Sequence, residues 1–443
     1  MRQPLLSQKS GPLSGRIAAP GDKSISHRAL ILGALSMGTS RIVGLLQADD
    51  VMATAAALVQ LGAKVGNERH EWFVTGRGVG GLMAPEAALD FGNSGTGARL
   101  MMGAVAGHEM TATFTGDESL KQRPMGRVLQ PLELMGLNVV EARETLPLTL
   151  IGTDDLIPIE YRLPVPSAQV KSAILLAGIL APGQTTVIEP EPSRDHTERM
   201  LEYLGAKVVI GERDGQRAVT VEGDAELVAR DIMVPGDPSS AAFFAAGALL
   251  SPGSDILIEN VLANPTRTGF YQCLAEMGGD IVFEGEHEAS GEPVADIRVR
   301  SSELHGITVP AARAPSLIDE YPCLAVLAAF ARGETRMEGL GELRVKESDR
   351  LASIADGLTA CGVEASIDGD ALVVVGMDQV PGGATVATNM DHRIAMAFLT
   401  LGIGAEQPVT VDDARMIATS FPDFPDLMAK LGADLRPGNA GAE

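Results

Sequence analysis

The amino-acid sequence predicts an α/β protein with two domains, each built from three copies of one structural unit. The chain has 443 residues, which is more than one hydrophobic core usually organises. A short signature also recurs about every 70 residues: LGAKV at Leu61, MGLNV at Met135, LGAKV at Leu204, MGGDI at Met277, CGVEA at Cys361 and LGADL at Leu431. Two domains of three units each fit this repeat and this length.

Each signature marks the end of a predicted helix and the beginning of a strand. The residues before it form an amphipathic segment, such as DDVMATAAALVQ at 49–60 or DHTERMLEY at 195–203. A glycine follows the last apolar position, where helices commonly end, and an alternating pattern typical of a strand comes next. The repeated unit therefore contains a helix, a glycine cap and a strand.

Each unit also contains a second predicted helix, which is apolar nearly all round. These six segments are ALILGALSM, ARLMMGAVAG, VKSAILLAG, AAFFAAGALL, PCLAVLAAF and RIAMAFLTLG. A helix without a polar face belongs in a domain interior. We therefore expect six buried helices, with the strands and the amphipathic helices packed around them.

The polar residues at the N-terminal ends of these helices indicate the kind of ligand. Helix N-termini present N–H groups and a partial positive charge, which favour anions. One interpretation is structural, because five of the residues are common N-caps: Ser24, Ser94, Ser167, Ser239 and Asp391. Caps alone do not require the cations of the first turns, which are Lys23, Arg28, Arg99, Lys171 and Arg393. We therefore expect an anionic ligand.

The overall charge and hydropathy exclude several classes of partner. A formal net charge of -23 repels nucleic acid and anionic membrane surfaces. Every apolar run is shorter than the roughly 18 residues of a membrane span. The N-terminal segment MRQPLLSQKSGPL has no apolar signal core. We therefore expect a cytoplasmic protein that binds neither nucleic acid nor membranes, and a monomer is the default expectation.

Metal and redox chemistry have little support in the sequence, and we expect neither a metal nor a cofactor. The histidines His27, His108, His196 and His392 lack the spacing of metal ligands. No Walker-type glycine loop for a nucleotide is present. The three cysteines, Cys273, Cys323 and Cys361, are too few and too scattered for a disulfide framework, which favours buried thiols.

Two charged motifs in the second half of the chain could carry acid–base chemistry. In LIDEYP, Asp319 and Glu320 open an apolar helix. In RVKESDR, Lys346 and Arg350 are expected at positions i and i+4 of one helical face, with Glu347 beside them. A salt-bridged surface is the alternative for such a cluster. Asp319 and Glu347 would form an acid–base pair if the fold brings them together.

Taken together, these motifs resemble those of the EPSP synthase family, the 3-phosphoshikimate 1-carboxyvinyltransferases. The resemblance runs in order from about Ser14 to Phe424, through PGDKSISHR, DFGNSGTGAR, GDESLKQRPM, SAQVKSAILLAG, SRDHTE, DEYP, RVKESDRL and DHRIAMAF. Among the branches of the family, the sequence is most similar to bacterial class II.

This resemblance implies a two-domain, inside-out α/β barrel with six βαβαββ-type units, three in each domain. The buried helices would point their N-termini at a cleft between the domains, where the active site would lie. One domain would consist of residues 1–19 plus 236–443, and the other of residues 20–235.

The resemblance also implies a reaction. The family transfers the enolpyruvyl (carboxyvinyl) group of phosphoenolpyruvate to the 5-hydroxyl of shikimate-3-phosphate, giving 5-enolpyruvylshikimate-3-phosphate and phosphate on the shikimate pathway to chorismate and aromatic amino acids. Both substrates are anionic, in agreement with the cationic helix ends. The resemblance also implies that glyphosate is an inhibitor. In some members an added methyl group at the Gly95 position crowds glyphosate more than phosphoenolpyruvate, and this chain has glycine there.

The resemblance finally implies roles for individual residues. Shikimate-3-phosphate would be bound by Lys23, Ser24, Arg28, Ser167, Ala168, Gln169, Arg194, Asp319 and Lys346. Phosphoenolpyruvate would be bound by Lys23, Asn93, Gly95, Arg123, Gln169, Glu347, Arg350 and Arg393. Asp319 would take the 5-hydroxyl proton and Glu347 would protonate the phosphoenolpyruvate methylene. Lys346 would share in the proton transfers, and Lys23, also counted as catalytic, would contact both substrates.

The sequence departs from the family pattern at two positions. Ala168 stands where many members carry a second serine, so one hydrogen bond to phosphate would be missing, with Arg194 as a substitute. Thr419 stands near the place where class I members carry a lysine, which removes one cation from the phosphoenolpyruvate site.

Two other functions remain open. The sister enzyme that transfers enolpyruvyl to UDP-N-acetylglucosamine carries a reactive cysteine in its first half, whereas no cysteine here precedes residue 240. A noncatalytic phosphometabolite-binding protein would keep the anion pocket, but it would gain nothing from the carboxylates of Asp319 and Glu347. Release of phosphate from phosphoenolpyruvate with each acceptor would distinguish the three.

Overall fold

The computed structural model describes residues 2–141 and 143–438, whose contacts divide into two compact units. Unit 1 comprises Met1–Pro20, Gly236–His287 and Pro293–Glu443, and unit 2 comprises Gly21–Pro235 and Glu288–Glu292. The predicted division differs in placing Pro20 and Glu288–Glu292 with the other part of the chain. The exact bounds of the two domains stay a prediction.

The strands of unit 2 form three four-stranded sheets within the described residues, and each sheet has one parallel and two antiparallel pairings. The first has the order β14 (Ile232–Met233), β3 (Thr39–Val43), β5 (Glu71–Thr75) and β4 (Lys64–Glu68). The second is β6 (Leu89–Asp90), β7 (Thr111–Thr115), β9 (Leu148–Ile151) and β8 (Asn138–Val139). The third is β10 (Glu160–Arg162), β11 (Gln184–Glu189), β13 (Gln216–Glu222) and β12 (Val208–Arg213).

Unit 1 repeats this pattern, again with three four-stranded sheets in the described part of the chain. One sheet has the order β16 (Asp280–Ala289), β17 (Glu292–Arg300), β15 (Asp255–Leu262) and β2 (Ser14–Ala18). Another is β18 (Thr308–Val309), β19 (Glu334–Met337), β21 (Ala371–Val375) and β20 (Glu364–Asp368). The last is β22 (Thr385–Val386), β23 (Val409–Val411), β1 (Leu5–Gln8) and β24 (Asp434–Pro437), which joins the two ends of the chain.

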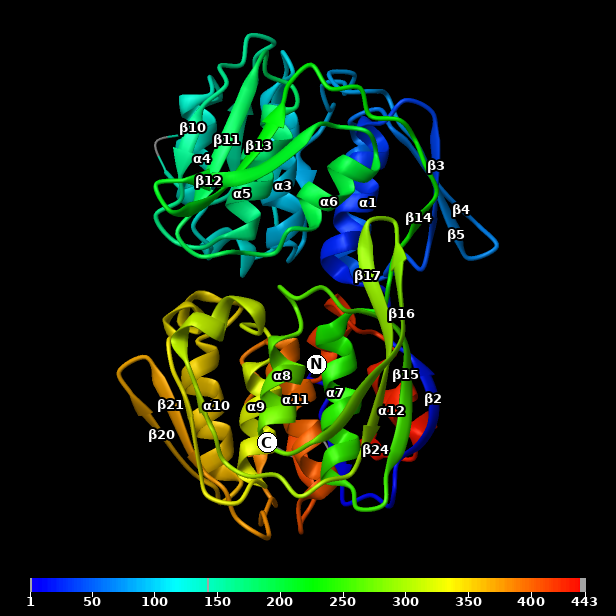
Figure 1. Ribbon diagram of the computed structural model, residues 1–443, viewed down its shortest axis with the longest axis vertical. Coiled ribbons are helices and arrows are strands. Elements are labelled where there is room, and N and C mark those ends of the chain that lie inside the picture. The colour runs from blue at the N-terminus through cyan, green and yellow to red at the C-terminus, as the bar shows by residue number, and fades with distance from the viewer. Residues whose placement is uncertain (1, 142, 439–443) are drawn as a thin grey trace. The chain divides into compact units, whose positions relative to one another are not determined.

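The six apolar segments form buried helices, as predicted. Unit 2 contains α1 (Lys23–Leu35), α3 (Gly95–Ala106) and α5 (Ala168–Gly178), and unit 1 contains α7 (Pro238–Leu250), α9 (Tyr321–Ala329) and α11 (His392–Gly404). Every residue of α7 and α9 is buried. Helices α7, α9 and α11 pack against one another inside unit 1 (Figure 1). None of the helices in the described ranges is both long and apolar enough to cross a membrane.

Gly103 permits close packing of α3 against α5 in unit 2. It lies in α3 where this helix crosses α5, and a Cβ atom at this position would overlap the backbone of Ala173. Any larger residue would push the two helices apart. Because Gln169 lies at the N-terminal end of α5, this close crossing also fixes where the ends of the two helices lie relative to each other.

The amphipathic helices and their glycine caps also agree with the repeat. They are α2 (Asp49–Gln60), α4 (Gly126–Leu134), α6 (His196–Tyr203), α8 (Gly269–Glu276), α10 (Arg350–Ala360) and α12 (Phe424–Leu431). The glycine that follows each has a φ between +81° and +113°: Gly62, Gly136, Gly205, Gly278, Gly362 and Gly432. Only glycine adopts this conformation without strain. Short 3-10 helices are η1 (Leu120–Gln122), η2 (Ala311–Ser316), η3 (Gly341–Val345) and η4 (Arg415–Thr419).

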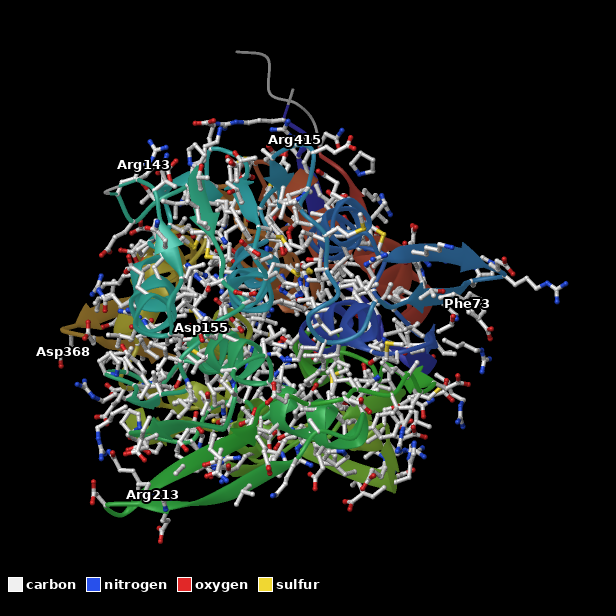
Figure 2. All side chains as sticks on the ribbon, turned by 90° about the horizontal axis from the view of Figure 1, so that it is seen from above. Phe73, Arg143, Asp155, Arg213, Asp368 and Arg415 are labelled. Carbon is white, nitrogen blue, oxygen red and sulfur yellow. The ribbon has the colours of Figure 1, made fainter. Side chains whose placement is uncertain are left out.

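Charged side chains lie along outer strands of the sheets. β12 and β20 are each the last strand of a sheet, and Arg213 in β12 and Asp368 in β20 are exposed (Figure 2). Charges on an outer strand discourage pairing with the sheet of another molecule.

Candidate functional site

Aspartate and serine residues cap the helices that carry the predicted site residues. Ser94 and Ser167 cap α3 and α5, as expected. The expected caps Ser24 and Ser239 are wrong, because Asp22 caps α1 and Asp237 caps α7. In both cases an aspartate precedes the serine by two positions, and its carboxylate accepts the hydrogen bond from the first helical turn.

Lys23, the first residue of α1, pairs with an acidic residue of α2. Its Nζ lies 3.1 Å from Oδ2 of Asp50, and the two side chains are 16% and 10% exposed. A cation at a helix N-terminus opposes the helix dipole, and the carboxylate offsets this cost. The sequence did not single out Asp50, because it looks like an ordinary acidic residue of the first turn of an amphipathic helix.

Arg28 is buried and connects α1 with α5 and α6. Its Nε donates to Oγ1 of Thr197 at 2.7 Å, and its Nη2 donates to Oγ of Ser172 at 2.7 Å. The pKa of Arg28 is lowered to about 10, chiefly by burial, and the charge of Arg194 contributes to this lowering. Unit 2 thus brings two arginines within electrostatic reach of each other, an arrangement that favours an anion between or beside them.

The N-terminal end of α5 is held to α3 by side-chain hydrogen bonds. Gln169 accepts a hydrogen bond at Oε1 from Nη1 of Arg99, 2.8 Å away, and donates from Nε2 to Oγ1 of Thr96, 2.9 Å away. Its amide is therefore fixed in one orientation. Ala168, the first residue of α5, has no hydroxyl to add to this end. Arg99 was noted in the sequence only as a first-turn cation, and its partner became clear from the fold.

Asn93, Gly95 and Arg123 come together at the start of α3. Arg123 donates from Nη2 to Oδ1 of Asn93 at 2.7 Å. A Cβ atom at Gly95 would lie 3.1 Å from Nη1 of Arg99 and 3.3 Å from Nη1 of Arg123. Gly95 therefore leaves space beside two guanidinium groups, which a methyl group would narrow.

Lys171 has a structural role instead of a ligand-binding one. Its Nζ lies 3.0 Å from Oε1 of Glu189 and 2.7 Å from Oε1 of Glu198, and none of these side chains is more than 2% exposed. The two carboxylates already neutralise this ammonium group. For this first-turn cation the structural interpretation is therefore the better one.

In unit 1, Arg350 joins the two carboxylates that the sequence suggested for acid–base chemistry. Its Nη1 lies 3.2 Å from Oδ1 of Asp319, and its Nη2 lies 2.5 Å from Oε2 of Glu347. A third carboxylate, that of Asp391, accepts from Nε at 2.8 Å. Burial alone would lower the pKa of Arg350, but Asp391, Glu347 and Asp319 raise it above its usual value, so the guanidinium stays charged.

Lys346 and Arg393 belong to the same cluster. Nζ of Lys346 lies 3.4 Å from Oδ1 of Asp319, and Nη1 of Arg393 donates to the backbone oxygen of Asp319 at 3.2 Å. The expectation that Lys346 and Arg350 share a helical face is wrong. Helix α10 begins at Arg350, because Asp349 caps it, and Lys346 lies in extended backbone after η3. The two cations meet through Asp319 instead of through helical spacing.

The unit 1 cluster has the groups that acid–base chemistry on an anion requires. Asp319 and Glu347 retain 14% and 20% exposure, whereas the side chain of Arg350 between them is 1% exposed. The buried arginine holds the two carboxylates, and because both side chains are partly exposed they can still exchange a proton with a ligand. Lys346 and Arg393 add positive charge for that ligand.

His27 is a buried structural residue in unit 2. Its Nδ1 lies 2.9 Å from Oγ1 of Thr54, and its Nε2 lies 3.5 Å from Oγ of Ser94. The pKa of His27 is lowered to about 3, chiefly by burial and in part by the charges of Lys23 and Arg28. The imidazole is therefore neutral near pH 7, and it connects α1 with α2 and with the cap of α3.

We expect His27 to make the fold sensitive to acid. Its pKa rises from about 3 in the folded protein to 6.5 in the unfolded chain, so the unfolded chain binds one more proton between these values. The free energy of unfolding should therefore fall by about 1.4 kcal/mol per pH unit as the pH decreases from 6.5. Urea unfolding between pH 7 and pH 4.5 measures this slope. In the His27→Gln variant the slope of unfolding free energy against pH should be smaller by about 1.4 kcal/mol per pH unit. Identical slopes in the variant and the wild type would contradict the lowered pKa of His27.

One group of described residues has a spacing that could hold a cation. Asp195, His196 and Glu292 of unit 2 are buried, and one ligand atom of each lies within 4.8 Å of the others. The guanidinium of Arg199 lies 2.9 Å from Oδ2 of Asp195 and already supplies positive charge there. His196 is hydrogen-bonded through Nδ1 to Oε1 of Glu292 at 2.7 Å. These contacts among the four side chains explain by themselves why the group lies together. The expected absence of a metal stays a prediction.

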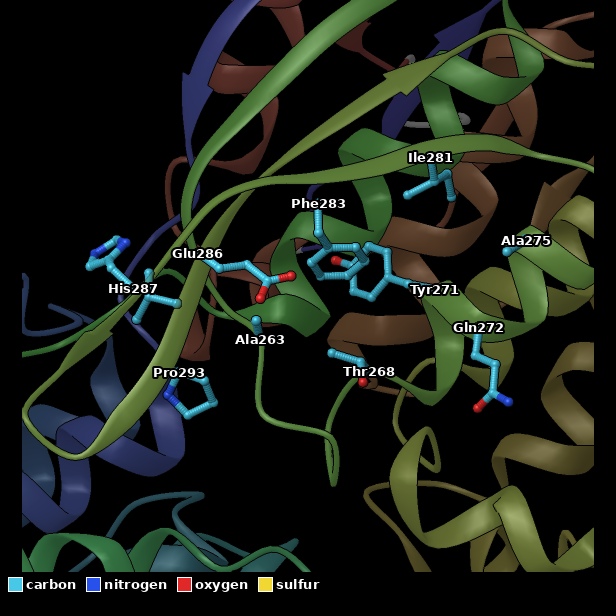
Figure 3. Close-up of a pocket in the computed structure, with 11 residues that line it drawn as sticks. Ala263, Thr268, Tyr271, Gln272, Ala275, Ile281, Phe283, Glu286, His287 and Pro293 are labelled. Atoms are coloured by element: carbon cyan, nitrogen blue, oxygen red, sulfur yellow. The ribbon is translucent and has the colours of Figure 1, made fainter.

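A pocket of about 590 Å³ opens in unit 1 between α8 and the strands β16 and β17 (Figure 3). Tyr271, Phe283 and Ile281 give it an apolar wall, and Glu286 adds a negative charge. The described residues that line it include no lysine or arginine, which a phosphate or carboxylate ligand would need. Its chemistry does not suit the predicted ligand, so the cationic helix ends remain the better candidate site.

The three cysteines are buried and unbridged. Burial raises the pKa of Cys361 to about 11 and also raises the pKa values of Cys273 and Cys323. Nucleophilic chemistry needs the thiolate form. The thiols are therefore poorly suited to act as the reactive cysteine of the sister enzyme.

Comparison with known proteins agrees with the geometry and the motifs. The family model described as EPSP synthase (3-phosphoshikimate 1-carboxyvinyltransferase) matches residues 7–428. A 3-phosphoshikimate 1-carboxyvinyltransferase of Parvibaculum lavamentivorans is 59% identical over 438 residues, which cover 97% of this chain and 96% of that protein. One from Cereibacter sphaeroides is 57% identical over 438 residues, 98% of each chain.

Solved structures extend the similarity to the fold. An EPSP synthase structure from Acinetobacter baumannii is 40% identical and superimposes with a TM-score of 0.88, covering 99% of this chain and 100% of that one. A second structure from that organism gives a TM-score of 0.87. The predicted fold class, a two-domain inside-out α/β barrel, is thereby confirmed. By its family match, its relatives and its fold, the chain belongs to the EPSP synthase family.

Proposed function

We propose that this protein transfers the carboxyvinyl group of phosphoenolpyruvate to the 5-hydroxyl of shikimate-3-phosphate and releases inorganic phosphate. The observation that carries the proposal is the cluster around Arg350, where Asp319 and Glu347 contact one buried guanidinium. Membership of the EPSP synthase family supports the same reaction and its place in the shikimate pathway.

Residues of unit 2 bind shikimate-3-phosphate in this proposal. Arg28 and Arg194 supply the cations for its phosphate, and Ser24 and Ser167 supply hydroxyl groups near the ends of α1 and α5. Lys23 reaches both substrates. Arg28 and Arg194 are close enough for the charge of Arg194 to act on Arg28, so both can supply positive charge to one phosphate group.

Arginines of both units bind phosphoenolpyruvate in this proposal. Arg123 contributes from the turn before α4, and Arg350 and Arg393 contribute from the first turns of α10 and α11. Gly95 leaves room beside Arg123 for the anion. The proposal requires that both units reach the same pair of substrates.

Two proton transfers accompany bond formation in the proposed first step. Asp319 takes the proton of the 5-hydroxyl as that oxygen bonds to C2 of phosphoenolpyruvate, while Glu347 donates a proton to C3, which becomes a methyl group. In the second step the carboxylate of Glu347 takes a proton back from C3, and the bond between C2 and the phosphate oxygen breaks. Phosphate leaves with the electron pair, and Lys346 and Lys23 stabilise the charge that develops.

An assay of inorganic phosphate with three acceptor conditions tests the proposal. Phosphoenolpyruvate with shikimate-3-phosphate should give phosphate in amounts equal to the acceptor consumed, and phosphoenolpyruvate alone should give none. Release only with UDP-N-acetylglucosamine would identify the sister activity, and binding of shikimate-3-phosphate without release would identify a noncatalytic protein. A cytoplasmic location and a monomeric state stay predictions.

Inhibition by glyphosate is a further part of the proposal. A methyl group at Gly95 would lie 3.1 to 3.3 Å from two guanidinium groups, which leaves less room for a longer anion than for phosphoenolpyruvate. We expect Gly95→Ala to raise the glyphosate inhibition constant at least about tenfold more than it raises KM for phosphoenolpyruvate. Steady-state inhibition measures both constants.

The matched control for this variant is Gly211→Ala. Gly211 lies in β12, where a Cβ atom would meet nothing within 4 Å, so neither constant should change. Equal increases of the two constants in Gly95→Ala would contradict the steric explanation, and a wild-type enzyme indifferent to glyphosate would contradict the predicted sensitivity.

A further inference from the structure

The tip of the hairpin formed by β16 and β17 belongs to unit 2, although the rest of the hairpin belongs to unit 1. Ser290 accepts a hydrogen bond at Oγ from the backbone N–H of Met233, 2.9 Å away. The backbone oxygen of Gly291 accepts from Nη1 of Arg199 at 3.3 Å. Gly291 has a φ of +85°, and a Cβ atom there would lie 3.2 Å from the backbone oxygen of Arg199. The tip is therefore closely fitted to helix α6.

Glu292 extends this contact into a buried ionic network. Its Oε1 lies 2.7 Å from Nδ1 of His196, the first residue of α6, and its Oε2 lies 3.9 Å from Nε of Arg199. The side chains of Glu292 and His196 are 1% and 0% exposed. A buried carboxylate with such partners restricts the position of the helix end to which it binds.

The first turn of α6 carries a hydrogen-bond partner of Arg28 and closely follows Arg194 in the chain. Thr197 follows His196 and accepts the hydrogen bond from Nε of Arg28 at 2.7 Å. Arg194 lies two residues before His196 in the chain. A displacement of the first turn of α6 would therefore move a partner of Arg28 and the backbone that carries Arg194 together.

The charge of Glu292 also acts on Arg28. Burial is the largest cause that lowers the pKa of Arg28 to about 10, and Arg194 contributes in the same direction. Glu292 acts in the opposite direction, together with Glu198 and Asp22, and favours the charged guanidinium. Glu292 thus offsets part of the repulsion between two neighbouring arginines.

We propose that Glu292 is a positioning residue for Arg28 and Arg194, and that it acts through His196 and the first turn of α6. This inference rests on the proposed function, because it takes these two arginines as the groups that bind the phosphate of shikimate-3-phosphate. The residue comes from a part of the sequence that was expected to belong wholly to the other domain. It touches neither substrate in this account.

The test compares Glu292→Gln with Glu288→Gln in the full chain. Both variants remove one negative charge from the same hairpin tip, but Glu288 is exposed. Glu292→Gln should raise KM for shikimate-3-phosphate, and its dissociation constant in calorimetry, about tenfold. Both kcat and KM for phosphoenolpyruvate should stay within twofold of wild type. Glu288→Gln should change none of these constants.

A second variant covers the case in which Glu292→Gln does not fold. Glu292→Asp keeps the charge but withdraws the carboxylate from His196 by one methylene group, and it should raise KM for shikimate-3-phosphate about threefold. Circular dichroism at the assay temperature establishes that each variant is folded.

Three outcomes would overturn the inference. The first is a folded Glu292→Gln variant whose affinity for shikimate-3-phosphate is unchanged. The second, if Glu292→Gln does not fold, is an unchanged affinity in Glu292→Asp. The third is a loss of affinity in Glu288→Gln equal to that in Glu292→Gln. In each case the wild-type enzyme still turns over, so the proposed function stands. A wild-type chain that does not bind shikimate-3-phosphate would overturn the proposed function itself, and the inference with it.

Discussion

Asp319→Asn is expected to lower kcat by about a thousandfold while both substrates still bind. The amide keeps the size of the carboxylate, and its oxygen can still accept from Arg350, which lies 3.2 Å from Oδ1 of Asp319. The amide cannot take up the proton of the 5-hydroxyl. Initial rates of phosphate release, measured against the concentration of each substrate, give kcat and both KM values.

Asp356→Asn is the matched control for this variant. Asp356 is exposed on α10, so the same chemical change there should leave the kinetics unchanged. A kcat of Asp319→Asn within tenfold of wild type would contradict the role of Asp319 as the base. A large rise in KM with kcat unchanged would assign Asp319 to substrate binding instead.

Arg350→Met is expected to have the largest combined effect on stability and binding. The substitution leaves Asp319, Glu347 and Asp391 without the guanidinium that lies within 3.2 Å of an oxygen of each. Removing one partner of a buried ionic network costs about 3 to 5 kcal/mol of unfolding free energy. The dissociation constant for phosphoenolpyruvate should rise at least about a hundredfold, because in the proposed function Arg350 supplies positive charge to this anion.

Arg344→Met, a change in the same RVKESDR motif, is the control for this experiment. The Arg344 side chain is 37% exposed and lies 3.6 Å from carboxylate oxygens of Asp349 and Asp370. Exposed ion pairs contribute at most about 1 kcal/mol, so urea unfolding of this variant should be nearly that of wild type. Equal unfolding free energies for the two variants would contradict the structural role of Arg350.

Much of the fold could be predicted from the sequence because its signals are local. The glycine after each amphipathic helix has a positive φ in all six signatures, and the segments without a polar face are the buried helices. Glycine conformation and hydrophobic periodicity depend on neighbouring residues, which the sequence displays directly. The sequence predicts that the hairpin tip at Glu288–Glu292 belongs with the rest of its hairpin, whereas its contacts place it in unit 2, because its partners in α6 lie 92 to 96 residues away in sequence.

The candidate site was predictable in its residue types but not in its contacts. The motifs identified Asp319, Glu347 and Arg350, and the structure brings them together. Helical spacing was the wrong reason to associate Lys346 with Arg350, because the cap at Asp349 starts α10 after Lys346. The ion pair between Lys23 and Asp50 could not be predicted from neighbouring residues, because it depends on how α1 packs against α2.

The central claim is that the chain adds the acceptor hydroxyl to phosphoenolpyruvate and then eliminates phosphate. Proton NMR of phosphoenolpyruvate and shikimate-3-phosphate with the enzyme in D₂O tests it most directly. C3 gains a proton from the acid in the first step and loses one in the second, so deuterium should appear in the vinyl methylene of the carboxyvinyl ether at the 5-oxygen. A product in which the vinyl group is bonded elsewhere, or unchanged phosphoenolpyruvate beside intact shikimate-3-phosphate, would contradict the account.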